Sequence, residues 1–125
     1  SEAFVEHWHD RLINIHPSLL PAFTGLNTHA RALDAGVKLH GCTVHFVRAA
    51  MDDGPIIAQA AVRVLPGDTA DTLAERVLAA EHWLYPFALS LVASERMRVV
   101  DERVVPSEPV APEDDAMLIS PPVGA

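Results

Sequence analysis

The chain has 125 residues, half of them hydrophobic, and its formal net charge is −8. This length suits one domain with a buried core and is short for two. The acidic balance argues against a nucleic-acid binder, because no cluster of lysines and arginines is present to neutralise a phosphate backbone.

The single cysteine, Cys42, has no partner for a disulfide within the chain and fits a reducing compartment. We expect it to be a small buried apolar residue. No apolar run approaches the length that spans a membrane, and no signal peptide is visible. We therefore expect a soluble, cytoplasmic domain with no membrane partner.

Hydrophobic periodicity and turn residues predict an alternation of helices and strands. The expected elements are, in chain order, a helix end at 2–9, a strand at 11–16, a loop at 17–25, a helix at 28–35, a strand at 42–48, a loop at 49–55, a strand at 56–64, a helix at 69–94 and a strand at 96–101. Thr69 is a candidate N-cap of the long helix, and Pro86 should kink or locally open it. Residues 104–125 hold five of the ten prolines and four acidic residues, so we expect an irregular tail after a structured part at 1–103. The alternation is typical of an α/β layer architecture with some parallel strand pairing.

The stretch "LINIHP" places two polar side chains in an otherwise apolar strand. Residues two apart on a strand point to the same face, so Asn14 and His16 lie side by side at its carboxyl end, where open α/β sheets bind ligands. An amide can donate to an oxygen that gains negative charge, and an imidazole can move a proton near neutral pH. A nearby carboxylate would favour the imidazolium form, and Asp52 and Asp53 are candidates. The alternative is that both residues only cap the strand and bond to backbone.

Several linked motifs then identify a family. The segment "NIHPSLLPAFTGLNTHARALDAGVKLHGCTVHFVRAAMDDGPIIAQAAVRV", together with "EHWLYP", closely resembles glycinamide ribonucleotide formyltransferase, a folate-dependent family of purine biosynthesis and one-carbon metabolism. The resemblance covers residues 3 to 103 and leaves out the tail. It implies a three-layer, Rossmann-like α/β fold with a mostly parallel sheet, of which this chain is the C-terminal catalytic part.

The resemblance also implies a reaction and its residues. The amine of glycinamide ribonucleotide attacks the formyl carbon of 10-formyltetrahydrofolate, which is the co-substrate, and no metal is expected. By the resemblance, Asn14 polarises the formyl oxygen, His16 donates a proton and Asp52 interacts with His16. The remaining residues that it implies are Pro17, Ser18 and Glu81 for the nucleotide, Val47, Arg48, Ala49, Ala50, Met51, Asp53 and Gly54 for the folate loop, and His45 as a support near the site.

The chain departs from the family pattern at three places. Asp53 and Asn27 stand where many members have Gly and His, and an Asp tolerates positive φ less well than Gly. The phosphate-binding half that begins the family's domain is not recognised here, because no helix start follows a glycine-rich loop. The spacing of His7 and His9 on a helix, without a third ligand, does not favour a metal site.

Two other functions stay open. Formyltetrahydrofolate deformylases share the Asn–His–Asp arrangement and pass the formyl group to water, although "HPSLLP" and "GLNTH" favour the transferase. The second open function is that of a non-catalytic fragment or interaction module that retains part of the fold. The acidity and the loop motifs disfavour methionyl-tRNA formyltransferase. We expect small-molecule substrates, no nucleic acid, and a monomer or homodimer.

Overall fold

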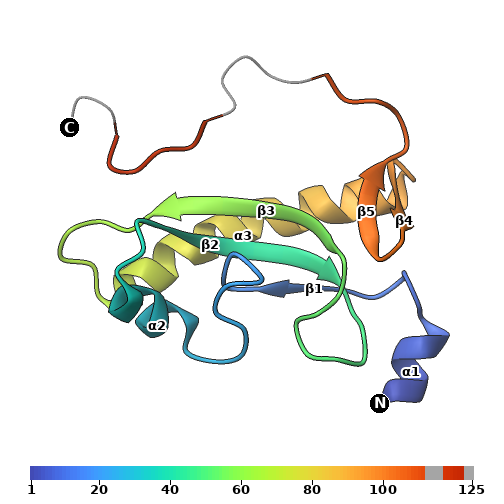
Figure 1. Ribbon diagram of the computed structural model, residues 1–125, viewed down its shortest axis with the longest axis horizontal. Coiled ribbons are helices and arrows are strands. Elements are labelled where there is room, and N and C mark those ends of the chain that lie inside the picture. The colour runs from blue at the N-terminus through green and yellow to red at the C-terminus, as the bar shows by residue number, and fades with distance from the viewer. Residues whose placement is uncertain (112–116, 123–125) are drawn as a thin grey trace.

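The computed structural model describes residues 1–111 and 117–122. Its elements are α1 (Glu2–His7), β1 (Ile13–His16), α2 (Thr28–Ala35), β2 (Leu39–Phe46), β3 (Ile56–Arg63), α3 (Ala70–Ala93), β4 (Met97–Val100) and β5 (Arg103–Pro106) (Figure 1). Every predicted helix and strand is present, with shifts of one to three residues at most ends. The α/β class is confirmed.

β2 lies at the centre of a sheet whose order is β1-β2-β3. Both of its pairings are antiparallel, with His16 opposite Thr43 and Asn14 opposite His45. The β4–β5 hairpin is antiparallel as well. Within residues 1–111 and 117–122, therefore, the parallel pairs that we expected are not found. The reason is local: α2 is short and lies beside the start of α3, so it does not carry the chain across the sheet (Figure 1).

One face of the sheet packs against α3 and forms the core (Figure 1). Alternate residues of β2 point to this face, as strand geometry requires. The buried members of the core are Ala32, Cys42, Val44, Phe46, Ile57, Leu73, Val77, Leu84 and Ala88. Ile13 and Ile15 of β1 join them, which directs Asn14 and His16 to the opposite face.

The opposite face of β2 holds down the loop that follows β1. The Thr43 hydroxyl donates to the Ser18 carbonyl at 2.7 Å and accepts from the Leu20 amide at 3.1 Å. Gln59 of β3 donates to both the Leu20 carbonyl and the Thr43 hydroxyl. These buried polar contacts satisfy the backbone of an irregular segment, which fixes where the chain goes after His16.

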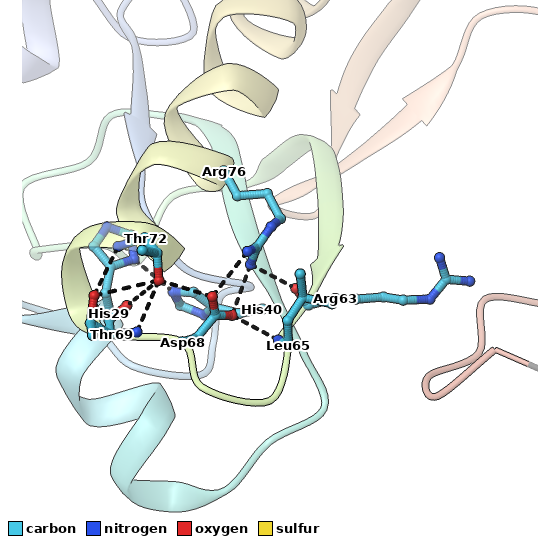
Figure 2. A network of polar contacts seen from close by, with 8 residues as sticks. All are labelled: His29, His40, Arg63, Leu65, Asp68, Thr69, Thr72 and Arg76. Carbon is cyan, nitrogen blue, oxygen red and sulfur yellow. Dashed lines mark hydrogen bonds and ion pairs between the residues drawn. The ribbon is translucent and has the colours of Figure 1, made fainter. Parts of the chain in front are cut away.

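The long helix begins as its sequence predicts. Thr69 is its N-cap, and the Thr69 and Thr72 side chains each bond the other residue's backbone amide. Asp68 accepts from Thr72 and forms an ion pair with Arg76, whose nitrogen and the Asp68 oxygen are 2.9 Å apart (Figure 2). The Arg76 hydrogen bonds hold the pKa of the Asp68 carboxyl well below its usual range. The helix is continuous through Pro86.

The C-terminal part begins with more order than expected. β5 ends at Pro106, three residues past the boundary placed at 103, because Val104 and Val105 pair with β4. The described residues 107–111 and 117–122 have no helix or strand. The rest of the predicted tail, 112–116 and 123–125, lies outside the described residues. Among the described helices, none has the length and hydropathy needed to cross a membrane.

Candidate functional site

His16, the last residue of β1, is held on both sides by oxygen acceptors. Its residue exposure is 7%, its Nε2 lies 2.9 Å from the Phe23 carbonyl, and its Nδ1 lies 3.5 Å from Oδ1 of Asp52. A neutral imidazole has one donor and one acceptor, whereas the imidazolium donates from both nitrogens. Each ring nitrogen of His16 thus has an oxygen acceptor beside it, one from the backbone and one from a carboxylate.

Asp52 connects His16 to a second loop. While Oδ1 faces His16, Oδ2 accepts from the Gly25 amide at 2.9 Å. The Asp52 side chain is 9% exposed, and its backbone has the left-handed φ of 54°. The structure thus brings together the predicted His16–Asp52 pair, and it places the positive φ at Asp52 rather than at the neighbouring Asp53.

Asn14 lies on the same face as His16, two residues earlier, but at the surface. It is exposed, and its side chain makes no hydrogen bond with the described part of the chain. An amide in this position is available to an outside ligand. The two side chains share one face, as the sequence predicts, and the structure adds that the amide is exposed while the ring is buried.

His45, opposite Asn14 on β2, is 3% exposed. Its Nδ1 donates to the Phe46 carbonyl at 2.9 Å, which leaves Nε2 buried without a partner among the described residues. Gly54 packs over the same point: a Cβ there would lie 1.6 Å from the Phe46 oxygen and 3.4 Å from His45 Nδ1. Only glycine permits this approach, which closes the 47–54 loop over His45.

Glu81 of α3 is half-buried, and the adjacent His82 is exposed. Burial raises the pKa of the Glu81 carboxyl, and the charges of His82 and His16 oppose that rise. Glu81 is therefore within electrostatic range of His16, although no direct contact joins them. A carboxylate so placed can accept hydrogen bonds from the hydroxyls of a ligand.

Two predicted nucleotide-binding residues lie at the start of the loop after β1. Ser18 is fully buried and its hydroxyl donates to the Ala22 carbonyl at 2.6 Å, while the Pro17 carbonyl accepts from Thr28. The Ser18 hydroxyl is thus occupied within the loop. A contact of these two residues with a ligand stays a prediction.

The predicted folate loop, 47–54, leaves β2 and returns to β3, and the Phe46 amide bonds the Pro55 carbonyl across its base. Four members are exposed and available to a ligand: Ala49, Ala50, Met51 and Asp53. Val47 is half-buried and its amide bonds the Leu12 carbonyl at 2.8 Å. Arg48 differs from all of these, because its guanidinium is paired with Asp10 and Glu102.

A histidine pair beside the site was missed by the sequence analysis. His40 is 1% exposed, and its Nε2 lies 3.1 Å from Nδ1 of His29 (Figure 2). Burial, followed by the charges of His29 and His16, lowers the pKa of His40 to about 4. The Phe23 ring contacts the His40 ring edge-on, with centroids 6.1 Å apart. A histidine in an apolar strand is the one signal in the sequence that pointed to this pair.

Cys42 is buried in the core, as expected. Burial, with a smaller contribution from Glu81, raises the pKa of the Cys42 thiol to about 11. The thiolate is the nucleophilic form of cysteine, so this thiol is chemically quiet near neutral pH.

The sequence pattern of the formyl transferase family matches residues 1–89. The chain belongs to the formyl transferase family. It is 55% identical over 102 residues to the trifunctional purine biosynthetic protein adenosine-3 of Drosophila pseudoobscura pseudoobscura, which covers 82% of this chain and 8% of the insect protein.

Solved structures of two kinds share the fold. The phosphoribosylglycinamide formyltransferase of Anaplasma phagocytophilum is 50% identical, with a TM-score of 0.83 over 89% of this chain and 55% of its own. A formyltetrahydrofolate deformylase from Pseudomonas syringae is 32% identical, with a TM-score of 0.81 over 84% of this chain and 35% of its own. The chain thus spans about half the length of the formyltransferase that it matches.

Proposed function

We propose that this chain carries the catalytic groups of a phosphoribosylglycinamide formyltransferase that takes its formyl group from 10-formyltetrahydrofolate. The observation that carries the proposal is the His16–Asp52 pair, with Asn14 exposed beside it on one face of the sheet. The 50% identity to the phosphoribosylglycinamide formyltransferase of Anaplasma phagocytophilum supports the choice of substrates. The setting is then purine biosynthesis in the cytoplasm.

The chemistry follows from the positions of the side chains. When the amine of glycinamide ribonucleotide attacks the formyl carbon, the formyl oxygen gains negative charge, and the Asn14 amide N–H donates to it. As the bond between the formyl carbon and the tetrahydrofolate nitrogen breaks, His16 supplies the proton that this leaving nitrogen needs, and the attacking amine gives up one proton in return. Asp52 stabilises the imidazolium before transfer. Because both ring nitrogens face protein acceptors, one of these contacts must be exchanged for substrate during the step.

The remaining groups are assigned to binding. Glu81 accepts from the ribose hydroxyls of the nucleotide, beside Pro17 and Ser18. The exposed residues of the 47–54 loop cover the folate, with His45 and Gly54 fixing how the loop is seated.

The test uses a chimaera in which this chain is joined to the part of the Anaplasma phagocytophilum formyltransferase that has no counterpart in it. We call this chimaera the completed enzyme. Asn14→Ala and His16→Ala should each lower turnover by about 100-fold or more, as for oxyanion and general-acid groups. His7→Ala, on the exposed surface of α1, is the control and should leave turnover unchanged. Near-normal rates in both site variants would refute the mechanism.

A second candidate is hydrolysis of 10-formyltetrahydrofolate, favoured by the TM-score of 0.81 to a deformylase. The same three side chains would then serve attack by water. Formate released at the same rate with and without the amine acceptor is the result that this candidate requires.

A further inference from the structure

The side chain of Arg48 is the most heavily bonded one at the root of the 47–54 loop. Its Nε donates to Glu102 at 2.9 Å, and its Nη2 donates to Asp10 at 2.6 Å and to Glu102 at 3.1 Å. Its Nη1 donates to the Val47 carbonyl at 3.2 Å. Four of the five N–H groups of this guanidinium are thus used within the protein.

The partners of Arg48 come from distant parts of the chain. Asp10 lies between α1 and β1, and Glu102 lies in the turn of the β4–β5 hairpin. Both partners have a left-handed backbone, with φ of 60° and 58°, a conformation that costs a residue with a side chain more than it costs glycine. A glycine at either place would relieve that cost and remove the carboxylate.

Arg48 is the more buried member of both ion pairs. The Arg48 side chain is 13% exposed, against 36% for Asp10 and 60% for Glu102. A half-buried guanidinium that bonds Glu102 through two nitrogens and Asp10 through one is held in one orientation. The Arg48 hydrogen bonds also lower the pKa of the Glu102 carboxyl, so the pair stays ionised near neutral pH.

We infer that Arg48 is a positioning residue rather than a contact for folate, and that it fixes the root of the loop that presents Asp52 to His16. The inference deepens the proposed function and rests on it for the meaning of the loop. The other end of the loop is already fixed, because Gly54 packs on the Phe46 carbonyl. With Arg48 in place, the four residues before Asp52 are anchored at their start, and Asp52 is anchored by Gly25 and His16.

Amide hydrogen exchange of the chain itself tests the inference without any substrate. Arg48→Ala should speed exchange by roughly tenfold at the Val47 amide, which bonds the Leu12 carbonyl, and at the Gly25 amide, which bonds Asp52. This is the effect expected for loss of a hydrogen bond between charged groups. Glu102→Gln should act in the same direction and less strongly. The double variant should exchange no faster than Arg48→Ala, because both changes break one interaction.

Two further variants separate positioning from general loss of structure. Arg48→Lys keeps the charge without the fork and should restore part of the protection. Arg98→Ala removes an exposed arginine from the same hairpin and should leave the loop unchanged. Exchange at the Val47 and Gly25 amides that equals the unaltered chain in both Arg48→Ala and Glu102→Gln would overturn the inference.

Kinetics of the completed enzyme give the second readout. Arg48→Ala should raise KM for 10-formyltetrahydrofolate severalfold, with a smaller fall in kcat and partial rescue by Arg48→Lys. Unchanged KM together with unchanged kcat would contradict a role in seating the loop. If the unaltered enzyme transfers no formyl group, the proposed function fails, whereas hydrogen exchange still decides the role of Arg48.

Discussion

The two carboxylate oxygens of Asp52 make different contacts, and mutations can separate the roles of these contacts. One oxygen lies 3.5 Å from Nδ1 of His16, and the other accepts from the Gly25 amide. Asn at this position keeps an oxygen for Gly25 and loses the charge, whereas Ala loses both. The residue is therefore both an electrostatic partner and a tie between two loops.

These roles predict different kinetics for the two variants. Asp52→Asn should lower kcat by about tenfold to 100-fold while KM for folate changes little, because only the stabilised imidazolium is lost. Asp52→Ala should lower kcat at least as far and also raise KM, because the loop is released. Steady-state kinetics of the completed enzyme measure both. Identical kinetics for Asn and Ala would show that the tie to Gly25 has no part in binding.

His40 predicts a particular loss of stability in acid. Its pKa is about 4 in the folded chain and 6.5 as the ordinary value, so between these values only the unfolded chain binds a proton there. The free energy of unfolding then falls as the pH falls through this range, by roughly 2 kcal/mol between pH 7 and 4.5. His40→Gln should remove this part of the loss, measured by urea unfolding at both pH values. His82→Gln, which alters an exposed histidine, should leave the loss unchanged. An equal fall in the free energy of unfolding in the unaltered chain and in both variants would contradict the assignment.

At the scale of elements, α3 depends on its first turn. Thr69→Ala removes the side chain that caps the Thr72 amide and should lower the free energy of unfolding by about 1 kcal/mol. Chemical denaturation measures this, with Glu75→Ala in the exposed second turn as the control. A change no larger than that of the control would mean that the Asp68 and Arg76 contacts hold the turn without the cap (Figure 2).

The helices were predictable because their signals are local. Residues 28–35 and the Thr69 cap were placed to the residue from periodicity and from one capping side chain. The start of β2 was missed by three residues, because Gly41 weakens a strand pattern. Gly41 is there for a tertiary reason: a Cβ would lie 1.9 Å from the Ala60 carbonyl of β3. The antiparallel pairing of β2 with its neighbours was also missed, because it depends on where α2 lies in the fold.

The residues of the site likewise differ in whether a local pattern or the tertiary fold places them. Asn14 and His16 share a strand, so period-two geometry places them together, and the family motifs supply Asp52. The contacts of Phe23, Gly25 and His40 depend on how the loop after β1 folds back. That course is fixed by Thr43 and Gln59 from two other strands, which no local pattern reveals.

At the scale of the molecule, both sides of α3 carry apolar residues. One side forms the core, and the other exposes a stacked pair, Trp83 and Phe87, with ring centroids 5.3 Å apart. Trp83 is 67% exposed, and β1 pairs on one side only within the described sheet (Figure 1). An open strand edge and an uncovered aromatic pair favour association. This distribution is why activity is best measured on the completed enzyme as well as on the chain alone.

The most direct test of the proposed function is tetrahydrofolate formation from 10-formyltetrahydrofolate, with and without glycinamide ribonucleotide. The completed enzyme should turn over only when the amine acceptor is present, and His16→Ala should abolish this turnover. Equal rates with and without the acceptor would contradict the transferase and favour the deformylase. No turnover in a folded, completed enzyme would mean that Asn14, His16 and Asp52 are held in place here without the activity.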